Sequence, residues 1–529
     1  MNRFLNGRSL LLIVAIHVLS GHMFAADEAS GEGQGTRIGE RRVPTEISAP
    51  AGAADSGSRF LTVVRRAVDV ILENGRDTYG DQHSEMIISV LDRKNGRPLR
   101  SLPQPPQGVR HSDRVGPGGS NANLQQDLYR TMLHLSRLSG DTQYEQAAQA
   151  ALRDFIRITQ HPDTGLLAWG EHLYWNCVED RLGDLDPNRT HEPKKKFVLF
   201  DVVHAVEPER TLKYARGLWD HQIADQKTGN FSRHARYDRH DPRRDYDFAK
   251  EGGYFIDTWS RAYAVSQDKV FATAVRVLTQ RYLNRMSSSG HLALDSTTRP
   301  EWFETSPSLY AVALAAECTD AAERMDSESA FLLRKLVAAQ DQAFLSMPHR
   351  PADPARGFVS YADTESGQPK PVEAKQSNGF SRHWGLGYGV HSTAMIALLC
   401  NTRQQQLGDS ERGEEYRRLV VEAATLYLNE SPDPAGDDLW AGEYGTVIFT
   451  LLAAHRISHD SRYLDRAIAL ADDAVRIFWD NDKPLPRASA KTDYYDVVTG
   501  TDTLSLALLA VHEQISGEVP QIEVSDLIR

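Results

Sequence analysis

The sequence predicts an all-α protein whose helical hairpins close into an (α/α)6 or (α/α)7 toroid. Apolar residues at helical spacing dominate the chain from residue 58 onward, and strand patterns are few. Similar short joints recur between successive hairpins, whereas loops of variable length precede the second helix of each hairpin. Long loops would then collect on one rim and form a cleft. An open solenoid of the same hairpins is the alternative architecture.

The first outer helix is predicted where Phe60, Leu61, Val64, Val68 and Ile71 recur every three or four residues. Further outer helices are predicted to begin near residues 142, 210, 268, 328, 412 and 461. Each is followed, after its loop, by an apolar inner helix rich in small residues.

Three joints between hairpins share a Ser-x-Asp pattern. They read Leu138-Ser-Gly-Asp141, Val265-Ser-Gln-Asp268 and Ile457-Ser-His-Asp460, and Leu407-Gly-Asp409 is a weaker version. An aromatic residue follows the aspartate by three positions in the three full joints, as Tyr144, Phe271 and Tyr463. Each aspartate is expected to be an N-cap, because its carboxylate can accept the free N–H groups of the first helical turn.

Composition and charge narrow the range of possible functions. The chain has 529 residues, with 72 acidic and 60 basic residues and a formal net charge of −12. This balance argues against a nucleic-acid partner that is bound by phosphate neutralisation. The three cysteines, Cys177, Cys318 and Cys400, lack ligand or base spacing and are predicted to be buried free thiols.

The N-terminal residues 1–26 have the order of a secretory signal, with Arg3 and Arg8, an apolar run and then small residues. The run is too short to span a bilayer, which takes about twenty residues. Residues 27–57 are predicted to be a flexible linker and residues 58–529 a single catalytic domain. We therefore expect a secreted or periplasmic protein without a membrane span, whose oligomeric state the sequence leaves open.

The loop between residues 164 and 176 concentrates aromatic and polar side chains. A sugar-stacking wall with polar groups aimed into a cleft is one interpretation, and an aromatic plug that packs the rim is the other. The residues singled out as candidates are Trp169, Glu171, His172, Tyr174 and Asn176.

Two later loops share one tetrapeptide, Phe231-Ser-Arg-His234 and Phe380-Ser-Arg-His383, each just before an inner helix. Arginine suits a two-pronged bond to a carboxylate, and histidine can move a proton near neutral pH. Arg233, His234, Arg382 and His383 therefore indicate a site for an acidic sugar, against the alternative of surface arginines and hydrogen-bonded histidines.

Aromatic and acidic residues at the starts of inner helices extend the list of substrate-binding candidates, although such residues also pack cores. They are Tyr254, Trp259, Trp384, Tyr388, Glu443 and Tyr444.

No metal ligand and no required cofactor are assigned from the sequence. A Ca²⁺ site could be formed by Asp238, Asp241, Asp245 and Asp247, but their spacing favours a salt-bridged loop. The histidines at 161, 191, 204, 221 and 234 lack the close pairing of a zinc site. Nucleotide-binding, serine-hydrolase and HExxH motifs are absent from the sequence.

The chain resembles the helical-toroid carbohydrate-active enzymes, a group of polysaccharide lyases and glycoside hydrolases. The resemblance lies in the repeated joints, Trp169-Gly-Glu-His172, Gly253-Tyr-Phe-Ile-Asp-Thr-Trp259 and Thr499-Gly-Thr-Asp-Thr-Leu504, and covers roughly residues 58–515. It implies export, an extended saccharide substrate and chemistry on the loop rim.

The first hypothesis is a lyase that cuts a uronic-acid-containing glycan by β-elimination. A cation or amide must neutralise the carboxylate, a base must take the C5 proton, and an acid must protonate the leaving oxygen. The candidates are Arg233, Arg382 and Asn176 for the first role, His172, His234 or His383 for the base, and Tyr174, Tyr254 or Tyr388 for the acid.

Three alternatives remain open. A glycoside hydrolase on the same toroid would use two carboxylates. A sugar epimerase would use two opposed histidines, and a non-catalytic protein would only bind the saccharide. The hydrolase candidates are Glu171, Glu192, Asp257, Glu304 and Glu443.

Overall fold

The computed structural model describes residues 56–184, 189–294, 300–375, 377–387, 389–479 and 483–522. The predicted signal at 1–26 and nearly all of the predicted linker lie outside the described residues. The linker prediction was wrong at its end, because the first helix already begins at Ser56.

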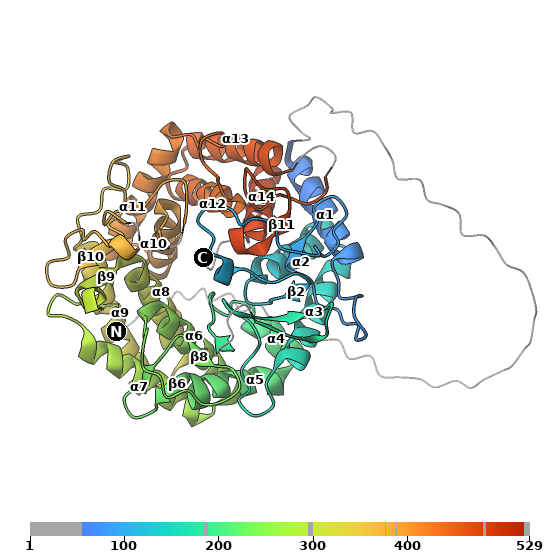
Figure 1. Ribbon diagram of the computed structural model, residues 1–529. Helices are drawn as coiled ribbons and strands as arrows, with labels where there is room; N and C mark the ends of the chain where they lie inside the picture. Colours follow the sequence, from blue (N-terminus) through green and yellow to red (C-terminus); the bar gives the residue numbers. More distant parts are fainter. Residues whose placement is uncertain are drawn as a thin grey trace, which may run out of the picture. The chain divides into compact units, whose positions relative to one another are not determined.

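The helices of the described part alternate between an outer and an inner ring (Figure 1). The outer helices are α1 (Ser56–Asn74), α3 (Gln143–Thr159), α5 (Pro208–Gly217), α7 (Lys269–Arg285), α9 (Ser327–Leu345), α11 (Glu411–Asn429) and α13 (Ser461–Phe478). The inner helices are α2 (Gln126–Ser139), α4 (Phe200–Val206), α6 (Ala249–Ser266), α8 (Ser308–Arg324), α10 (Thr393–Leu407), α12 (Ala441–Ser458) and α14 (Thr501–Ser516). Each outer helix leads into the next inner one, which makes the unit an (α/α)7 toroid.

The ring closes where the last hairpin meets the first. Helix α14 packs against both α1 and α2, while α6, α8, α10, α12 and α14 contact one another in succession. The inner helices α8, α12 and α14 are buried on nearly all sides, and every residue of α12 from Ala441 to Ala454 is buried, whereas the short α4 buries only Phe200 and Val203. The outer helix α13 buries only one face, from Tyr463 to Phe478. The open solenoid is therefore excluded.

The predicted joints form a shared structure. In each, the serine hydroxyl donates to a carbonyl of the preceding inner helix and accepts the N–H of the aspartate. The middle residue takes the left-handed conformation, with φ of 71° at Gly140, 57° at Gln267 and 57° at His459. Asp268 and Asp460 cap the next helices, as predicted.

The joint at Asp141 and the weaker joint at Asp409 differ from the prediction, because neither aspartate is the N-cap. Thr142 occupies the N-cap position of α3, although Asp141 still accepts the N–H of Gln143 at 3.1 Å. At α11 the cap is Ser410, whose hydroxyl accepts the N–H of Gly413, and Asp409 instead pairs with Arg417.

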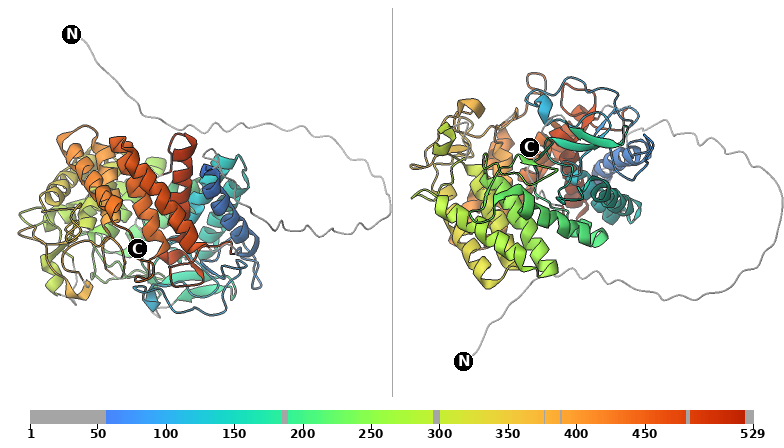
Figure 2. Two further views of the ribbon diagram at one scale, coloured as in Figure 1. Left: turned by 90° about the horizontal axis from the view of Figure 1, so that it is seen from above. Right: turned by 60° about the horizontal axis from the view of Figure 1, so that its bottom comes forward.

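Short antiparallel strands build the long loops and lie at one end of the helical ring (Figure 2). They pair as β1–β11, β2–β3–β4, β5–β8, β6–β7 and β9–β10. Their bounds are β1 (Val90–Leu91), β2 (Gly119–Ser120), β3 (Leu173–Asn176), β4 (Arg181–Asp184), β5 (Thr190–His191), β6 (Ile223–Asp225), β7 (Asn230–Phe231), β8 (Ala235–Arg236), β9 (Thr305–Pro307), β10 (Tyr361–Asp363) and β11 (Tyr495–Asp496).

All three cysteines are buried and unbridged, as predicted. Among the described residues, no helix combines the length and apolar character that crossing a membrane would need.

The joints provide a test of backbone strain. Replacing the exposed His459 by glycine should raise the free energy of unfolding by about 1 kcal/mol, because a side chain in the left-handed region costs roughly that much. Replacing Gly140 by alanine should lower it by about 1 kcal/mol, since a Cβ there meets nothing within 4 Å and only the backbone is affected. Urea denaturation followed by circular dichroism measures both, and equal stability of H459G and wild type would contradict the expectation.

Candidate active site

Three rim segments bring His172, Glu192 and His234 together. Strand β5 pairs with β8 so that His191 lies opposite Ala235, which places Glu192 beside His234. A parallel bridge between Gly170 and Glu192 brings the His172 loop alongside. Gly170 has a φ of 96°, and a Cβ there would collide with the Glu192 carbonyl, so this close approach requires glycine.

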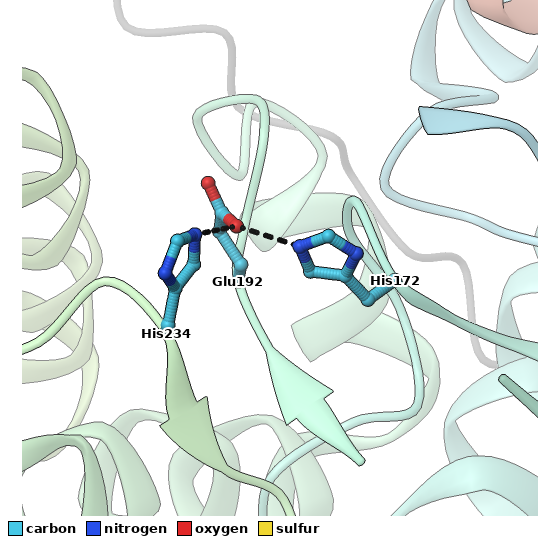
Figure 3. A group of neighbouring side chains, drawn as sticks. All are labelled: His172, Glu192 and His234. Carbon is cyan, nitrogen blue, oxygen red and sulfur yellow. Dashed lines mark ion pairs between the residues drawn. The ribbon is translucent and has the colours of Figure 1, made fainter. Parts of the chain in front are cut away.

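The three side chains face one another (Figure 3). Glu192 Oε2 lies 3.2 Å from His172 Nε2 and 2.9 Å from His234 Nε2, and the imidazole centroids are 5.8 Å apart. The Glu192 side chain is fully buried, whereas those of His172 and His234 are 11% and 26% exposed. We call these three residues the triad.

Cationic neighbours compensate the buried carboxylate. Arg233 pairs with Glu192 Oε1, and Lys194 Nζ lies 3.0 Å from the same oxygen. Burial by itself would raise the pKa of Glu192, but the charges of Arg233 and His234 hold it well below the usual value. Glu192 is therefore a carboxylate at neutral pH. Burial lowers the pKa of His234, and the adjacent carboxylate opposes that shift.

Lys194 links the triad to a second carboxylate. It pairs with Glu171 as well as with Glu192. Arg110 Nη2 in turn lies 2.7 Å from Glu171 and 2.5 Å from Asp113. Charges of alternating sign therefore extend from the triad to the loop before α2.

The triad has the donors of a metal site. One atom from each residue lies within 4.8 Å of the others, and this is the one such group of three found among the described residues. Glu192 Oε2 is buried and receives no well-directed hydrogen bond from those residues, so the two imidazoles and the carboxylate face a common point instead. Two imidazoles and one carboxylate suit Mn²⁺, Co²⁺, Ni²⁺ or Zn²⁺ better than Ca²⁺ or Mg²⁺.

A pocket opens beside the triad. Lys194, Arg233 and Asp113 lie in its wall, and further lining residues come from the starts of α6 and α8 and from the segment before α10. Arg233 is held against the rings of Phe248 and Tyr246, with centroid distances of 5.0 and 5.7 Å. The guanidinium is thereby fixed between Glu192 and the pocket.

Several sequence candidates do meet here. His172, His234, Arg233 and Glu171 all belong to the triad or its charged surroundings. The aromatic-rich loop and the first tetrapeptide therefore contribute to one site.

Other candidates pack the core. Trp169 lies against Phe197 and Tyr214, and Trp259 is fully buried and donates to the Ala215 carbonyl. Tyr444 is buried against Phe478. For these three aromatic residues, the structure corrects the expected saccharide contact to a packing contact.

The polar candidates Tyr174, Asn176 and Tyr254 also make contacts within the protein itself. Tyr174 is 6% exposed, and its ring fills the space beside Gly116, Gly119 and Gly183. Asn176 accepts the N–H groups of the following turn. Tyr254 is buried, with its ring 5.7 Å from Lys250 Nζ.

The second tetrapeptide lines another hollow, which shares Val390 with the pocket beside the triad. His383 lies 3.1 Å from Glu430, and Arg382 and Trp384 line the hollow beside it. Glu443 accepts the N–H groups of Gly385 and Leu386 and so anchors this loop to α12. Tyr388 lies outside the described residues.

The mixed-charge loop shows arginine pairing at three of its four aspartates. Asp238 pairs with Arg236, Asp241 with Arg243, and Asp247 with Arg281 and Arg285 of α7. The fourth, Asp245, accepts the N–H of Tyr246. This is the arrangement expected for the salt-bridged loop.

Sequence reasoning did not single out Lys194, Arg110, Lys250 or Lys375. Glu192-Pro-Lys194 carried a usable signal, a carboxylate and a cation in a polar loop, but isolated lysines are common on surfaces.

Comparison with known proteins bears on this same region. Residues 110–254 match the sequence model of the periplasmic pectate lyases. That segment contains the whole triad, Arg110, Glu171 and Lys194. The pectate disaccharide-lyase of Dickeya dadantii is 28% identical over 123 residues, which are 23% of this chain and span only 22% of the relative's length.

Solved structures of similar arrangement include cellobiose 2-epimerase from Bacillus thermoamylovorans and an unsaturated glucuronyl hydrolase specific for heparin. The first has a TM-score of 0.45 and 10% identity, covering 86% of this chain and all of that one. The second has a TM-score of 0.44 and 11% identity, covering 89% and all of that chain.

The triad should bind a transition-metal ion. Replacing His234 by alanine should weaken Mn²⁺ binding at least about 100-fold, because a direct ligand is lost. His383 to alanine is a matched control from the identical tetrapeptide, and it should leave the affinity unchanged. Calorimetric titration of chelator-treated protein measures both, and equal Mn²⁺ affinity of H234A and wild type would exclude the site.

Metal affinity should also depend on pH. Protons compete with the cation for imidazole nitrogen, so the affinity should fall as the pH falls. Because the pKa of His234 is lowered, its proton competes only at a lower pH than that of an unperturbed histidine. Titrations at pH 8, 7, 6 and 5 measure this, and an affinity constant across that series would contradict imidazole ligation.

Proposed function

We propose that this protein is a polysaccharide lyase that cleaves a uronic-acid-containing glycan of the pectate type by β-elimination, with a divalent cation at the triad. The observation that carries the proposal is the buried His172–Glu192–His234 group beside a cation-lined pocket. The match of this segment to periplasmic pectate lyases supports the substrate class. Secretion or a periplasmic location agrees with the signal predicted at residues 1–26.

The most demanding step of the reaction is neutralisation of the substrate carboxylate. In β-elimination a base removes the C5 proton, the C4–O4 bond breaks, a C4–C5 double bond forms, and the leaving oxygen gains a proton. The C5 proton is acidic enough only when the adjacent carboxylate is neutralised. A bound cation would supply that charge, and Arg233 is fixed next to it as a second positive group.

The triad histidines are no longer the best candidates for the base. Their Nε2 atoms face Glu192, so those nitrogens would hold a bound metal ion. Among the sequence candidates, Arg233 keeps its proposed role of carboxylate recognition, and His172 and His234 move from proton transfer to metal binding. His383 pairs with Glu430 in the other hollow.

The proposal is tested with polygalacturonate and a panel of neutral glycans. The metal-loaded protein should produce ultraviolet absorbance from the new C4–C5 double bond together with reducing ends, and chelation should abolish both. Reducing ends without absorbance would make the protein a hydrolase. Binding without cleavage of any glycan would make it a saccharide-binding protein.

Arg233 provides the residue-level test. Replacing it by alanine should lower kcat by about 10²–10³-fold, because a positive group that stabilises the developing charge is lost. Arg236 to alanine is the control, since Arg236 lies on β8 and pairs with Asp238 instead. Unchanged kcat in R233A, with the helical circular-dichroism signal intact, would remove Arg233 from the mechanism.

A further inference from the structure

A second group of charged side chains lies in the pocket that Arg233 borders. Lys250 is the second residue of α6, Tyr310 lies in the first turn of α8, and His391 directly precedes the Ser392 cap of α10. Lys375 ends the short 3₁₀ helix η4 (Glu373–Lys375). All four residues line this one pocket.

Both lysines are held by aromatic rings. Lys250 Nζ lies 5.7 Å from the ring centroid of Tyr254 and 5.8 Å from that of Tyr310. Lys375 Nζ lies 5.0 Å from the ring centroid of Trp302. The side chain of Lys250 is 12% exposed and the Lys375 residue 8%. Rings attract ammonium groups and limit their motion, so both charges have defined positions inside the pocket.

The charges of the two ammonium groups both affect the neighbouring side chain of His391. Burial lowers the pKa of His391 to about 3, and the charges of Lys375 and Lys250 add to the effect. His391 is therefore neutral at neutral pH and stacks on Tyr361, with ring centroids 4.7 Å apart. The carboxylate of Glu251 lies 3.7 Å from Lys250 Nζ, beyond hydrogen-bond distance. The pocket is lined by four cations, Lys194, Arg233, Lys250 and Lys375, and by two acids, Asp113 and Glu251, so its excess of positive charge favours an anionic ligand.

We propose that Lys250 and Lys375 form a second carboxylate subsite, which binds the uronate residue next to the one at the triad. This inference rests on the proposed function and narrows its substrate to chains with consecutive uronates. Glu251 Oε2 is buried without a hydrogen-bond partner among the described residues, and it can accept a hydrogen bond from a sugar hydroxyl.

The subsite draws on parts of the chain outside the segment matched by the pectate lyases. That segment ends at residue 254, and Tyr310, Lys375 and His391 follow it. Arg233 and Lys194, which pair with Glu192 of the triad, line the same pocket as the subsite because the toroid brings the starts of α6 and α8 and the segment before α10 together.

The test compares K250M, K375M and the double variant on galacturonate oligosaccharides. Each single variant should raise KM about tenfold with kcat changed less than threefold, and K375R should restore KM because it retains the charge. Lys370 to methionine is the matched control, since Lys370 pairs with Glu304 outside the pocket. The double variant should also lose the preference of the wild type for de-esterified over partly methyl-esterified oligosaccharides. Mn²⁺ affinity should be unchanged in all of these variants.

Calorimetric binding of a galacturonate trimer separates failure of this inference from failure of the proposed function. If the wild type binds the trimer without cleaving it, weaker binding by K250M and K375M would still support the subsite. If turnover occurs with wild-type KM, affinity and ester preference in the double variant, the subsite is wrong and the lyase stands. Absence of both binding and turnover in the wild type would overturn both.

Discussion

The buried carboxylate of Glu192 is the group on which the arrangement of this rim depends. A fully buried charge is tolerated only with compensating partners, and Glu192 has Arg233, Lys194 and two imidazoles around it. These partners come from the loop after α3, the segment before α4 and the strands before α6. The carboxylate therefore links two interhelical connections, the one between α3 and α4 and the one between α5 and α6, and the same links create the metal-binding geometry.

The toroid explains why chemistry gathers at this rim. Inner helices connect to the outer helix of the next hairpin through tight Ser-x-Asp joints. The long connections lead into the inner helices, so the N-terminal ends of α6, α8 and α10 border one pocket. Helix N-termini carry partial positive charge, and together with Lys250 and Lys375 they favour an anionic chain.

The two tetrapeptides show the limit of local inference. Phe231-Ser-Arg-His234 and Phe380-Ser-Arg-His383 are identical and both precede inner helices. Only the first lies beside Glu192, and the second lies beside Glu430, because a strand pairing that the tetrapeptide itself does not encode decides the neighbour. Trp259 and Tyr444 show the same limit. The sequence pattern around an aromatic residue at a helix start is the same whether its side chain faces a cleft or the core.

The sequence by itself determined the helical hairpins, their joints and the rim on which the long loops lie. These features depend on apolar spacing and capping groups a few residues apart, so they are local. It also indicated His172, Arg233 and His234 as members of a site. Only the tertiary structure decided that the described residues form seven hairpins, that the ring closes, and that Glu192 joins the two histidines. Ring closure and ligand convergence depend on contacts between segments far apart in the chain, which no local pattern specifies.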